Sequence, residues 1–434
     1  MPGADTTVQE RRTLTATVAS HVEQTAPPRI IVVQMGARHD YAVPAAFERL
    51  GMLEALYTDL CATQGLARAA AGLARLPVPM RARFAALGAR LPPSAVARKT
   101  TTFDWIGLQL NMIWQTGRAA SDSLAGRRYG MLSRALGEHM IRAGYGAATH
   151  VYSLFGEGGP FLTEARRRGL RVIVEVYIAL SADTIVRAEA RAFPGWSGRL
   201  SPGPMVSRSA RAHGELLLTA SDTFVCPSEF VRDDLVAVAG VAREKTVVVP
   251  YTVGEPWLAI DNRPEPGQVL FAGTADLRKG IHYLATAADR LRARRRYRFR
   301  VAGHAEPEVT GQPVCRALEF LGRVPRTQIH REFAAADLLV LPSLAEGSAG
   351  VTYEALGAGL PVVTTRAAGS VVRDGIEGLI VPERDPDALA SAIEAIVEDR
   401  PRRERMAAAA RERAREFTVD KFAGRLAESL IQNI

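Results

Sequence analysis

Two glutamates, Glu346 and Glu354, flank a turn of small residues. The sequence between them is GSAGVTY, an apolar run (residues 336–343) precedes them, and ALGAGLPVV follows. This order predicts a buried strand, a turn, a helix start, a glycine stop and a second strand. Backbone N–H groups at such a helix N-terminus bind anions, and carboxylates accept hydrogen bonds from hydroxyls. The segment therefore predicts a site for a phosphate with a polyhydroxylated group on each side, as in a nucleotide sugar.

Two cations, Arg278 and Lys279, precede Gly280 at the start of another predicted helix. They follow a strand-like run that ends in Gly273 and Thr274. Cations at a helix N-terminus oppose the helix dipole unless an anion is bound. We therefore predict that Lys279 and Arg278 stabilise a leaving diphosphate as the glycosidic C–O bond breaks. A solvated Arg–Lys pair is the alternative.

Glycines also follow two strand-like runs in the N-terminal half. Gly36 ends the first run and is followed by Arg38 and His39, and Gly156 follows a later one. A glycine at the carboxyl end of a strand lets a ligand approach the backbone, although any tight turn can carry glycine. These four residues are predicted to line a cleft. Neither segment is a GxGxxG fingerprint, so dinucleotide binding is not supported.

The segment Asp385-Pro386-Asp387 has the spacing of a metal-binding DxD motif. A helix start explains it better, with Asp385 as N-cap, Pro386 as the first helical residue and Asp387 as a first-turn acid. The eight histidines and three cysteines are scattered. The sequence therefore predicts no metal and no other cofactor, and isolated cysteines favour a reducing, cytoplasmic compartment.

The composition predicts a globular protein of two or three domains. The chain has 434 residues, of which 47% are hydrophobic and 23% charged. Its formal net charge is +9. This charge favours anionic partners such as nucleotides or anionic lipid, whereas an arginine-rich genome would produce the same balance without a functional cause. We predict no nucleic-acid partner. No apolar run is long enough to span a membrane.

Strand-like and helical runs alternate over most of the chain, which predicts an α/β fold with parallel sheets. A stretch rich in Pro and Gly, residues 251–267, is the predicted linker. It separates an N-terminal domain (29–250) from a C-terminal domain (268–415). Residues 1–28 are predicted to be a disordered tail without a secretory signal, and residues 416–434 a helix that packs back on the N-terminal domain. Two doubly wound Rossmann-like domains would hold a ligand between the carboxyl ends of their strands.

A basic segment, residues 64–102, is predicted to be a helical insertion in the N-terminal domain. No acidic residue occurs between Asp59 and Asp104, while arginines recur among Leu, Ala, Val, Met and Phe. Such a segment can lie on anionic lipid at the inner face of a membrane. It can equally cover the domain or form a solvated face.

These motifs resemble those of the retaining GT-B glycosyltransferases of family 4. The resemblance runs from about residue 225 to residue 422 and rests on several segments in the same order: VCPSEF (225–230), FAG (271–273), RKG (278–280), FLGRV (320–324), LPS (341–343), the segment 346–354 and GSVVRDGIEGL (369–379). It implies a GT-B fold and metal-independent transfer with retention. The donor would be a nucleotide-diphosphate sugar and the acceptor a hydroxyl of a glycan, lipid or small molecule.

The resemblance also implies roles for individual residues. Glu346 would contact hydroxyls of the donor sugar and Glu354 those of the ribose. Lys279 would hold the diphosphate. The remaining donor contacts would come from the backbone of Gly347, Ser348, Ala349, Gly350 and Val351 to the phosphates, from Gly322 and Arg323 to the base, and from the Gly273–Thr274 turn.

The sequence departs from the family pattern at three places. Thr274 stands where the family often has an arginine, so either Arg278 takes that role or the diphosphate is held less tightly. Residues 175–179 lack the histidine that many members carry near the transferred sugar, and residues 252–254 read TVG instead of GVD. Two other functions stay open: a sugar-nucleotide epimerase or phosphorylase with the same fold, and a non-catalytic nucleotide-binding subunit.

Overall fold

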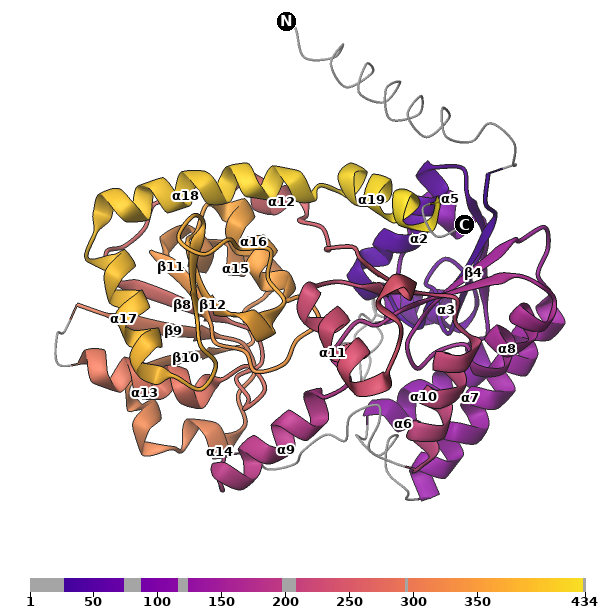
Figure 1. Ribbon diagram of the computed structural model, residues 1–434, viewed down its shortest axis with the longest axis horizontal. Coiled ribbons are helices and arrows are strands. Elements are labelled where there is room, and N and C mark those ends of the chain that lie inside the picture. The colour runs from indigo at the N-terminus through magenta and orange to yellow at the C-terminus, as the bar shows by residue number, and fades with distance from the viewer. Residues whose placement is uncertain (1–26, 74–86, 116–123, 197–207, 293–295, 432–434) are drawn as a thin grey trace, which may run out of the picture.

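The computed structural model describes residues 27–73, 87–115, 124–196, 208–292 and 296–431, which form two α/β domains (Figure 1). Most of the predicted disordered tail lies outside these residues. The N-terminal domain is built on a seven-stranded sheet with the order β3-β2-β1-β4-β5-β6-β7. Its strands, all paired in parallel, are β1 (Ile30–Val33), β2 (Leu53–Thr58), β3 (Thr100–Thr102), β4 (His150–Leu154), β5 (Arg171–Glu175), β6 (Thr223–Cys226) and β7 (Thr246–Val248).

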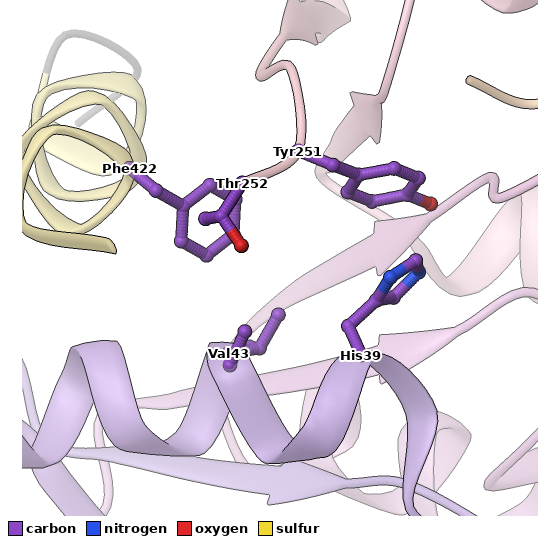
Figure 2. Close-up of a pocket in the computed structure, with 6 residues that line it drawn as sticks. His39, Val43, Tyr251, Thr252 and Phe422 are labelled. Carbon is purple, nitrogen blue, oxygen red and sulfur yellow. The ribbon is translucent and has the colours of Figure 1, made fainter. Parts of the chain in front are cut away.

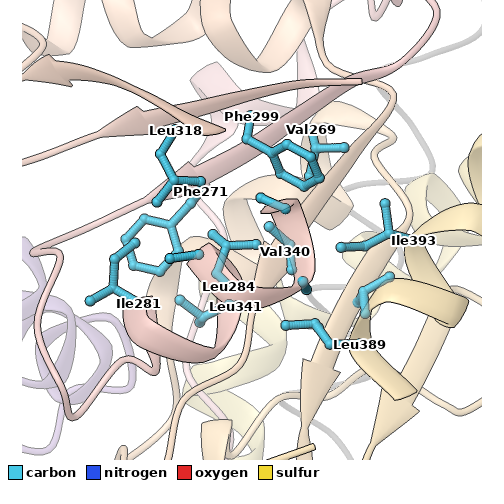
Figure 3. Packing of buried hydrophobic residues seen from close by; sticks show 14 of the residues in the cluster. Val269, Phe271, Ile281, Leu284, Phe299, Leu318, Val340, Leu341, Leu389 and Ile393 are labelled. Carbon is cyan, nitrogen blue, oxygen red and sulfur yellow. The ribbon is translucent and has the colours of Figure 1, made fainter. Parts of the chain in front are cut away.

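The C-terminal domain is built on a six-stranded parallel sheet with the order β10-β9-β8-β11-β12-β13. Its strands are β8 (Gln268–Ala272), β9 (Arg298–Ala302), β10 (Leu318–Gly322), β11 (Leu338–Leu341), β12 (Val362–Thr365) and β13 (Gly378–Val381). Successive residues of a strand point to opposite faces of the sheet. Accordingly, Val269 and Phe271 enter the core under α13 and α17 (Figure 3), while Leu270 enters the core of the other face. Burial on both faces explains the continuous apolar runs in the sequence.

Helices cover both sheets, as the alternating sequence pattern predicts. In the N-terminal half they are η1 (Arg38–Tyr41), α2 (Ala42–Arg49), α3 (Gly65–Leu73), α5 (Ser94–Ala97), α6 (Asp104–Gln115), α7 (Leu124–Ala143), α8 (Gly159–Arg167), α9 (Ala182–Ala192), α10 (Arg208–Ala220), α11 (Glu229–Ala239), η2 (Arg243–Lys245) and α12 (Glu255–Leu258). In the C-terminal half they are α13 (Ile281–Leu291), α14 (Pro307–Thr310), η4 (Pro313–Ala317), α15 (Arg326–Ala335), α16 (Gly350–Ala358), η5 (Arg366–Ala368), α17 (Pro386–Val397), α18 (Arg400–Ala414), η6 (Arg415–Phe417) and α19 (Val419–Ile431). None of these described helices combines the length and apolar character needed to cross a bilayer.

The predicted helical insertion, residues 64–102, is only partly helical. It contributes α3 and α5, but Thr100–Thr102 form β3, which pairs with β2 at the sheet edge. The prediction is therefore wrong for these three residues, because three threonines carry no apolar alternation that would mark an edge strand. Residues 74–86 of the insertion lie outside the described residues.

The chain passes between the two domains at several places. The sequence of α9 lies between two strands of the N-terminal sheet, yet the apolar residues that follow it pack on the other domain: Trp196 belongs to the C-terminal core and Phe193 contacts it. At the C-terminus, α19 packs on α2, and its residues Phe422, Leu426 and Leu430 enter a core of the N-terminal domain. Figure 1 shows α18 and α19 running along one side of both domains.

Candidate active site

The turn around Glu346 connects β11 to α16 at the carboxyl end of the C-terminal sheet. The apolar residues of β11 are fully buried, and α16 ends at Gly359 in the left-handed conformation (φ 73°). The sequence predicts this strand, turn and helix correctly. Residues 346–349 are buried, whereas Gly350 at the start of α16 is exposed.

Glu346 bridges the two cations that the sequence analysis singled out. Its Oε1 lies 2.6 Å from Lys279 Nζ and its Oε2 lies 2.6 Å from Arg278 Nη1. Burial raises the pKa of the Glu346 carboxyl, but Lys279 and Arg278 outweigh this effect, and the pKa lies below its usual value. The carboxylate therefore stays charged and pairs with both cations, which leaves the three side chains with a net positive charge.

The Lys279 side chain reaches Glu346 because of a tight turn at the start of α13. Asp276 Oδ1 accepts a hydrogen bond from Lys279 N (2.9 Å), and Gly280 has φ 70°. A Cβ at position 280 would lie 2.0 Å from Pro342 O, so only glycine fits there. The cations and Glu346 thus come together from two loops at the carboxyl ends of neighbouring strands, β8 and β11.

The backbone amides of the turn divide into two groups. Glu346 N and Ala349 N donate to Ala367 O (2.9 Å) and Ala368 O (3.0 Å). Among the described residues, no acceptor faces the amides of Gly350 and Val351, the first two of α16. The amides of Gly347 and Ser348 likewise have no acceptor among the described residues, so these four amides are open to an anion, while the amide of Ala349 is already engaged. Ser348 contributes its hydroxyl to Gly369 O (2.7 Å) and Tyr353 (2.8 Å).

Glu354 lies in the second turn of α16 and is partly buried. Within the described structure its carboxylate has no hydrogen-bond or ion-pair partner. Burial raises its pKa to about 7, against the opposing effect of Arg326. An unpaired carboxylate at this position can accept hydrogen bonds from a diol.

The other predicted donor residues lie at neighbouring strand ends. Gly273 (φ 135°) follows β8 beside the Lys279 side chain, and Thr274 is exposed. Gly322 is the last residue of β10 and Arg323 follows it; both are exposed, and Gly322 O accepts a hydrogen bond from Gly303 N (2.8 Å). All four therefore lie along the same sheet edge as Glu346.

The predicted N-terminal cleft residues lie at the carboxyl ends of β1 and β4. Gly36 N donates to Asp59 Oδ1 (2.8 Å) after β2. The Arg38 guanidinium lies 4.3 Å from the Tyr177 ring and 3.6 Å from Glu157, the residue after Gly156. Burial raises the pKa of Glu157 to about 8, although Arg38 opposes this.

A carboxylate that the sequence analysis did not select, Glu175, lies at the end of β5. It is 3% exposed and accepts hydrogen bonds from Tyr152 (2.6 Å) and Tyr251 (2.8 Å). The His39 ring lies 4.0 Å from the Tyr251 ring. An acid at the end of an apolar strand run was the available signal. Its two tyrosine partners come from β4 and the linker and could not be read from the sequence.

A small pocket lies at the linker, where His39, Val43, Tyr251, Thr252 and Phe422 converge (Figure 2). Burial lowers the pKa of His39, although Glu175 opposes this effect. None of the residues lining the pocket belongs to the Glu346 turn.

The two halves of the site touch directly. A Cβ added to Gly347 would lie 1.8 Å from Tyr177 O, so the two backbones are in close contact. Gly347 O also accepts a hydrogen bond from Ser228 Oγ (2.5 Å). At the edge of the interface, Arg366 pairs with Asp233 (2.9 Å). The Glu346 turn therefore faces the carboxyl ends of the N-terminal strands.

The described part of the chain contains no group of three or more His, Cys, Asp or Glu residues arranged to hold a metal ion. Asp385 caps α17, accepting hydrogen bonds from Asp387 N (3.0 Å) and Ala388 N (2.8 Å). The helix-cap interpretation of the DxD segment is confirmed.

Residues 266–399, which carry both cations and both glutamates, match the family described as "Glycosyl transferases group 1". The match covers most of the C-terminal domain and none of the N-terminal sheet. The chain is 28% identical over 254 residues to a glycogen synthase of Mycobacterium tuberculosis, covering 56% of this chain and 60% of the relative. It is 30% identical over 271 residues to a D-inositol 3-phosphate glycosyltransferase of Xylanimonas cellulosilytica, covering 54% and 62%. The chain thus spans less than two thirds of these glycosyltransferases.

The whole fold matches solved structures of similar size. Sucrose-phosphate synthase from Thermosynechococcus elongatus superposes with a TM-score of 0.62 at 15% identity, covering 93% of this chain and 98% of that one. The Anabaena protein HepE, in complex with UDP and glucose, superposes with a TM-score of 0.56 at 15% identity, covering 93% and 99%. The predicted GT-B fold, two Rossmann-like domains, is confirmed.

Proposed function

We propose that this chain is a retaining, metal-independent glycosyltransferase of family 4 that moves a sugar from a nucleotide-diphosphate donor to an acceptor hydroxyl. The observation that carries the proposal is the bridge from Glu346 to Lys279 and Arg278 beside the open N-terminus of α16. A lone carboxylate holding two cations next to free backbone amides is an anion site with an internal counter-ion. The solved complex of HepE with UDP supports testing uridine diphosphate sugars first.

A bound diphosphate would exchange partners within this cluster. Its oxygens would accept hydrogen bonds from Lys279, Arg278 and the amides of Gly350 and Val351. Glu346 would then be released to accept hydrogen bonds from hydroxyls of the transferred sugar. Glu354 would accept from the ribose hydroxyls, one helical turn away from those amides.

The reaction follows from this arrangement. The bond between the anomeric carbon and the diphosphate oxygen breaks, and the electron pair leaves with the diphosphate, whose charge Lys279 and Arg278 stabilise. The acceptor oxygen forms the new bond on the same face, and its proton passes to the departing diphosphate oxygen. Contact between Gly347 and Tyr177 would exclude water from the donor during transfer.

We expect Lys279→Ala to lower kcat by about 10²–10³-fold, because it removes one preorganised charge from the leaving group. Initial rates of donor consumption with a uridine diphosphate sugar, with and without added acceptor, measure the effect. Lys245→Ala, an exposed lysine in η2, is the matched control and should leave the rate unchanged. Unchanged turnover in Lys279→Ala would refute the assignment. Conversion of the donor to an isomeric nucleotide sugar without acceptor would indicate an epimerase instead.

The affinity for a ribonucleoside diphosphate should rise with pH through the pKa of Glu354, about 7. The carboxylate is the better acceptor for ribose hydroxyls, so binding favours its ionised form. Between pH 6 and 8 the ionised fraction rises about tenfold, and the affinity should follow it. In the unfolded chain the Glu354 carboxyl ionises near pH 4.5, whereas in the folded protein it stays protonated up to about pH 7. The protonated carboxyl therefore adds to the free energy of unfolding below pH 4.5, and this stabilisation is lost as the pH rises to about 7.

Calorimetric titration with UDP at several pH values measures this dependence. Glu354→Gln is neutral at every pH and should lack the contribution, while the titration of the phosphate itself remains in both proteins. The same pH dependence in wild type and variant would show that Glu354 does not contact the ligand.

A further inference from the structure

One face of α6 carries large apolar side chains into solvent. Trp105 is 70% exposed and Met112 is 63% exposed. They are separated by two helical turns, with the partly exposed Leu108 and Gln109 between them on the same face. Large exposed apolar patches on a protein surface mark sites of interaction.

The patch continues onto α7, which packs beside α6 (Figure 1). Arg128 Nη2 donates to Gln109 Oε1 (3.2 Å), which places Arg128 next to the apolar stripe. Met131, one turn further along α7, is 65% exposed, and Arg134 after it is also exposed. The face thus combines apolar side chains with arginines, and one exposed acid, Glu138, follows Arg134 by one turn of α7.

The start of α3 borders the same patch. Leu66 N donates to Asp104 Oδ2 (2.6 Å), the residue before Trp105, and the Leu66 side chain is 43% exposed. Arg68 follows it and is exposed. The sequence between Asp59 and Asp104 contains no acidic residue, so the described part of α3 adds a cation and no carboxylate to this border.

The patch adjoins the N-terminal side of the cleft. A Cβ on Gly107 would lie 2.7 Å from Asp59 O, so the first turns of α6 pack directly on the segment that follows β2. The Asp59 side chain accepts the hydrogen bond from Gly36 N and pairs with Arg90 (2.7 Å). Trp105, two residues before Gly107, lies on the opposite, solvent side of this first turn, and the turn itself follows the carboxyl end of β3.

We propose that the exposed face of α6 and α7, with the start of α3, docks on an anionic lipid bilayer. Trp and Met side chains enter the interface between head groups and acyl chains, and arginines beside them pair with anionic head groups. An acidic protein surface would match the arginines but would leave Trp105, Met112 and Met131 without an apolar environment. The bilayer satisfies both.

The consequence of docking rests on the proposed function. A docked α6–α7 face places the cleft beside the membrane surface, so the acceptor hydroxyl would be carried by an amphiphile in the bilayer. Gly36 and Arg38 line the side of the cleft that would receive it. The docking itself is independent of the chemistry in the cleft.

The test is co-sedimentation of the full chain with vesicles of phosphatidylcholine that contain about 30 mol% phosphatidylglycerol. The ionic strength is kept low, because electrostatic attraction to the vesicles is strong under that condition. We expect wild type to sediment with these vesicles, to bind pure phosphatidylcholine at least tenfold more weakly, and to dissociate in high salt. The variant Trp105→Gln/Met112→Gln should bind the anionic vesicles at least tenfold more weakly. Val238→Gln, an exposed apolar residue on α11 (54%), is the control and should bind as wild type.

Equal binding of wild type to neutral and anionic vesicles, or equal binding of the double variant and wild type, overturns the proposal. A wild-type dimer that dissociates in the double variant also overturns it, because the face would then cover a second copy. Stabilisation by UDP, measured without vesicles, separates the two proposals. If UDP stabilises the protein but the protein does not bind vesicles, only the docking surface is refuted. If the protein binds vesicles but no nucleoside diphosphate stabilises it, the donor site is refuted.

Discussion

Glu346→Ala should abolish sugar transfer and at the same time increase the stabilisation of the protein by a nucleoside diphosphate. The carboxylate is the counter-ion of two cations that are mostly buried, with side chains 13% (Lys279) and 26% (Arg278) exposed. Removing it leaves both charges unpaired and should lower the free energy of unfolding by about 3 kcal/mol. A bound diphosphate would restore the missing negative charge, so the shift in Tm with UDP should exceed that of wild type.

The control is Glu346→Gln, which keeps the shape of the side chain and one acceptor oxygen but removes the charge. It should show the same enlarged nucleotide response with a smaller loss of stability. Thermal melts with and without UDP, together with donor consumption, give both readouts. A Tm shift in Glu346→Ala that is smaller than in wild type would mean that the diphosphate does not take over the partners of Glu346.

Gly347→Ala should impair transfer through the domain interface. A Cβ there would lie 1.8 Å from Tyr177 O, so the Glu346 turn and the segment after β5 would be forced apart. Such overpacking costs about 1–3 kcal/mol, and it would also lengthen the hydrogen bond from Ser228 to Gly347 O. We expect kcat to fall at least tenfold, with a smaller effect on the affinity for UDP, because the open amides of α16 belong to the C-terminal domain alone.

The matched change is Gly72→Ala in α3, where an added Cβ meets no atom within 4 Å. It should be neutral or slightly stabilising, since alanine favours the helix. Unfolding by urea and steady-state kinetics measure both variants. A Gly347→Ala protein with wild-type kcat would show that the contact with Tyr177 has no part in turnover.

The sequence predicted the elements around Glu346 in the C-terminal domain well because each had a strong local signal. The apolar run of β11, the glycine stop at Gly359 and the Asp385 cap all appear where expected. The ion pairs of Glu346 could not be predicted, because Lys279 lies on another strand end and only the sheet order brings the two together. Likewise, glycine is required at position 347 because of a neighbour in the other domain, Tyr177 O, which the sequence does not reveal.

The N-terminal half was harder to predict for physical reasons. Strand β3 consists of three threonines and has no apolar period. The sequence places Glu175 at the end of a strand, but it does not reveal its tyrosine partners, which come from separate elements. For α9 the amphipathic pattern indicates a helix with one buried face. It does not indicate that the partner is the C-terminal domain.

The attachment of α9 decides how this protein can be divided. Glu189, 3% exposed, accepts hydrogen bonds from His282 (3.1 Å, with the imidazole as donor) and Tyr283 (2.9 Å) of α13 and pairs with Arg384. A chimaera cut at the linker would separate this carboxylate from all three partners and expose Trp196 on the transplanted half. Exchange of N-terminal domains between relatives should therefore leave residues 182–196 with the C-terminal domain that receives them, although they precede it in the chain.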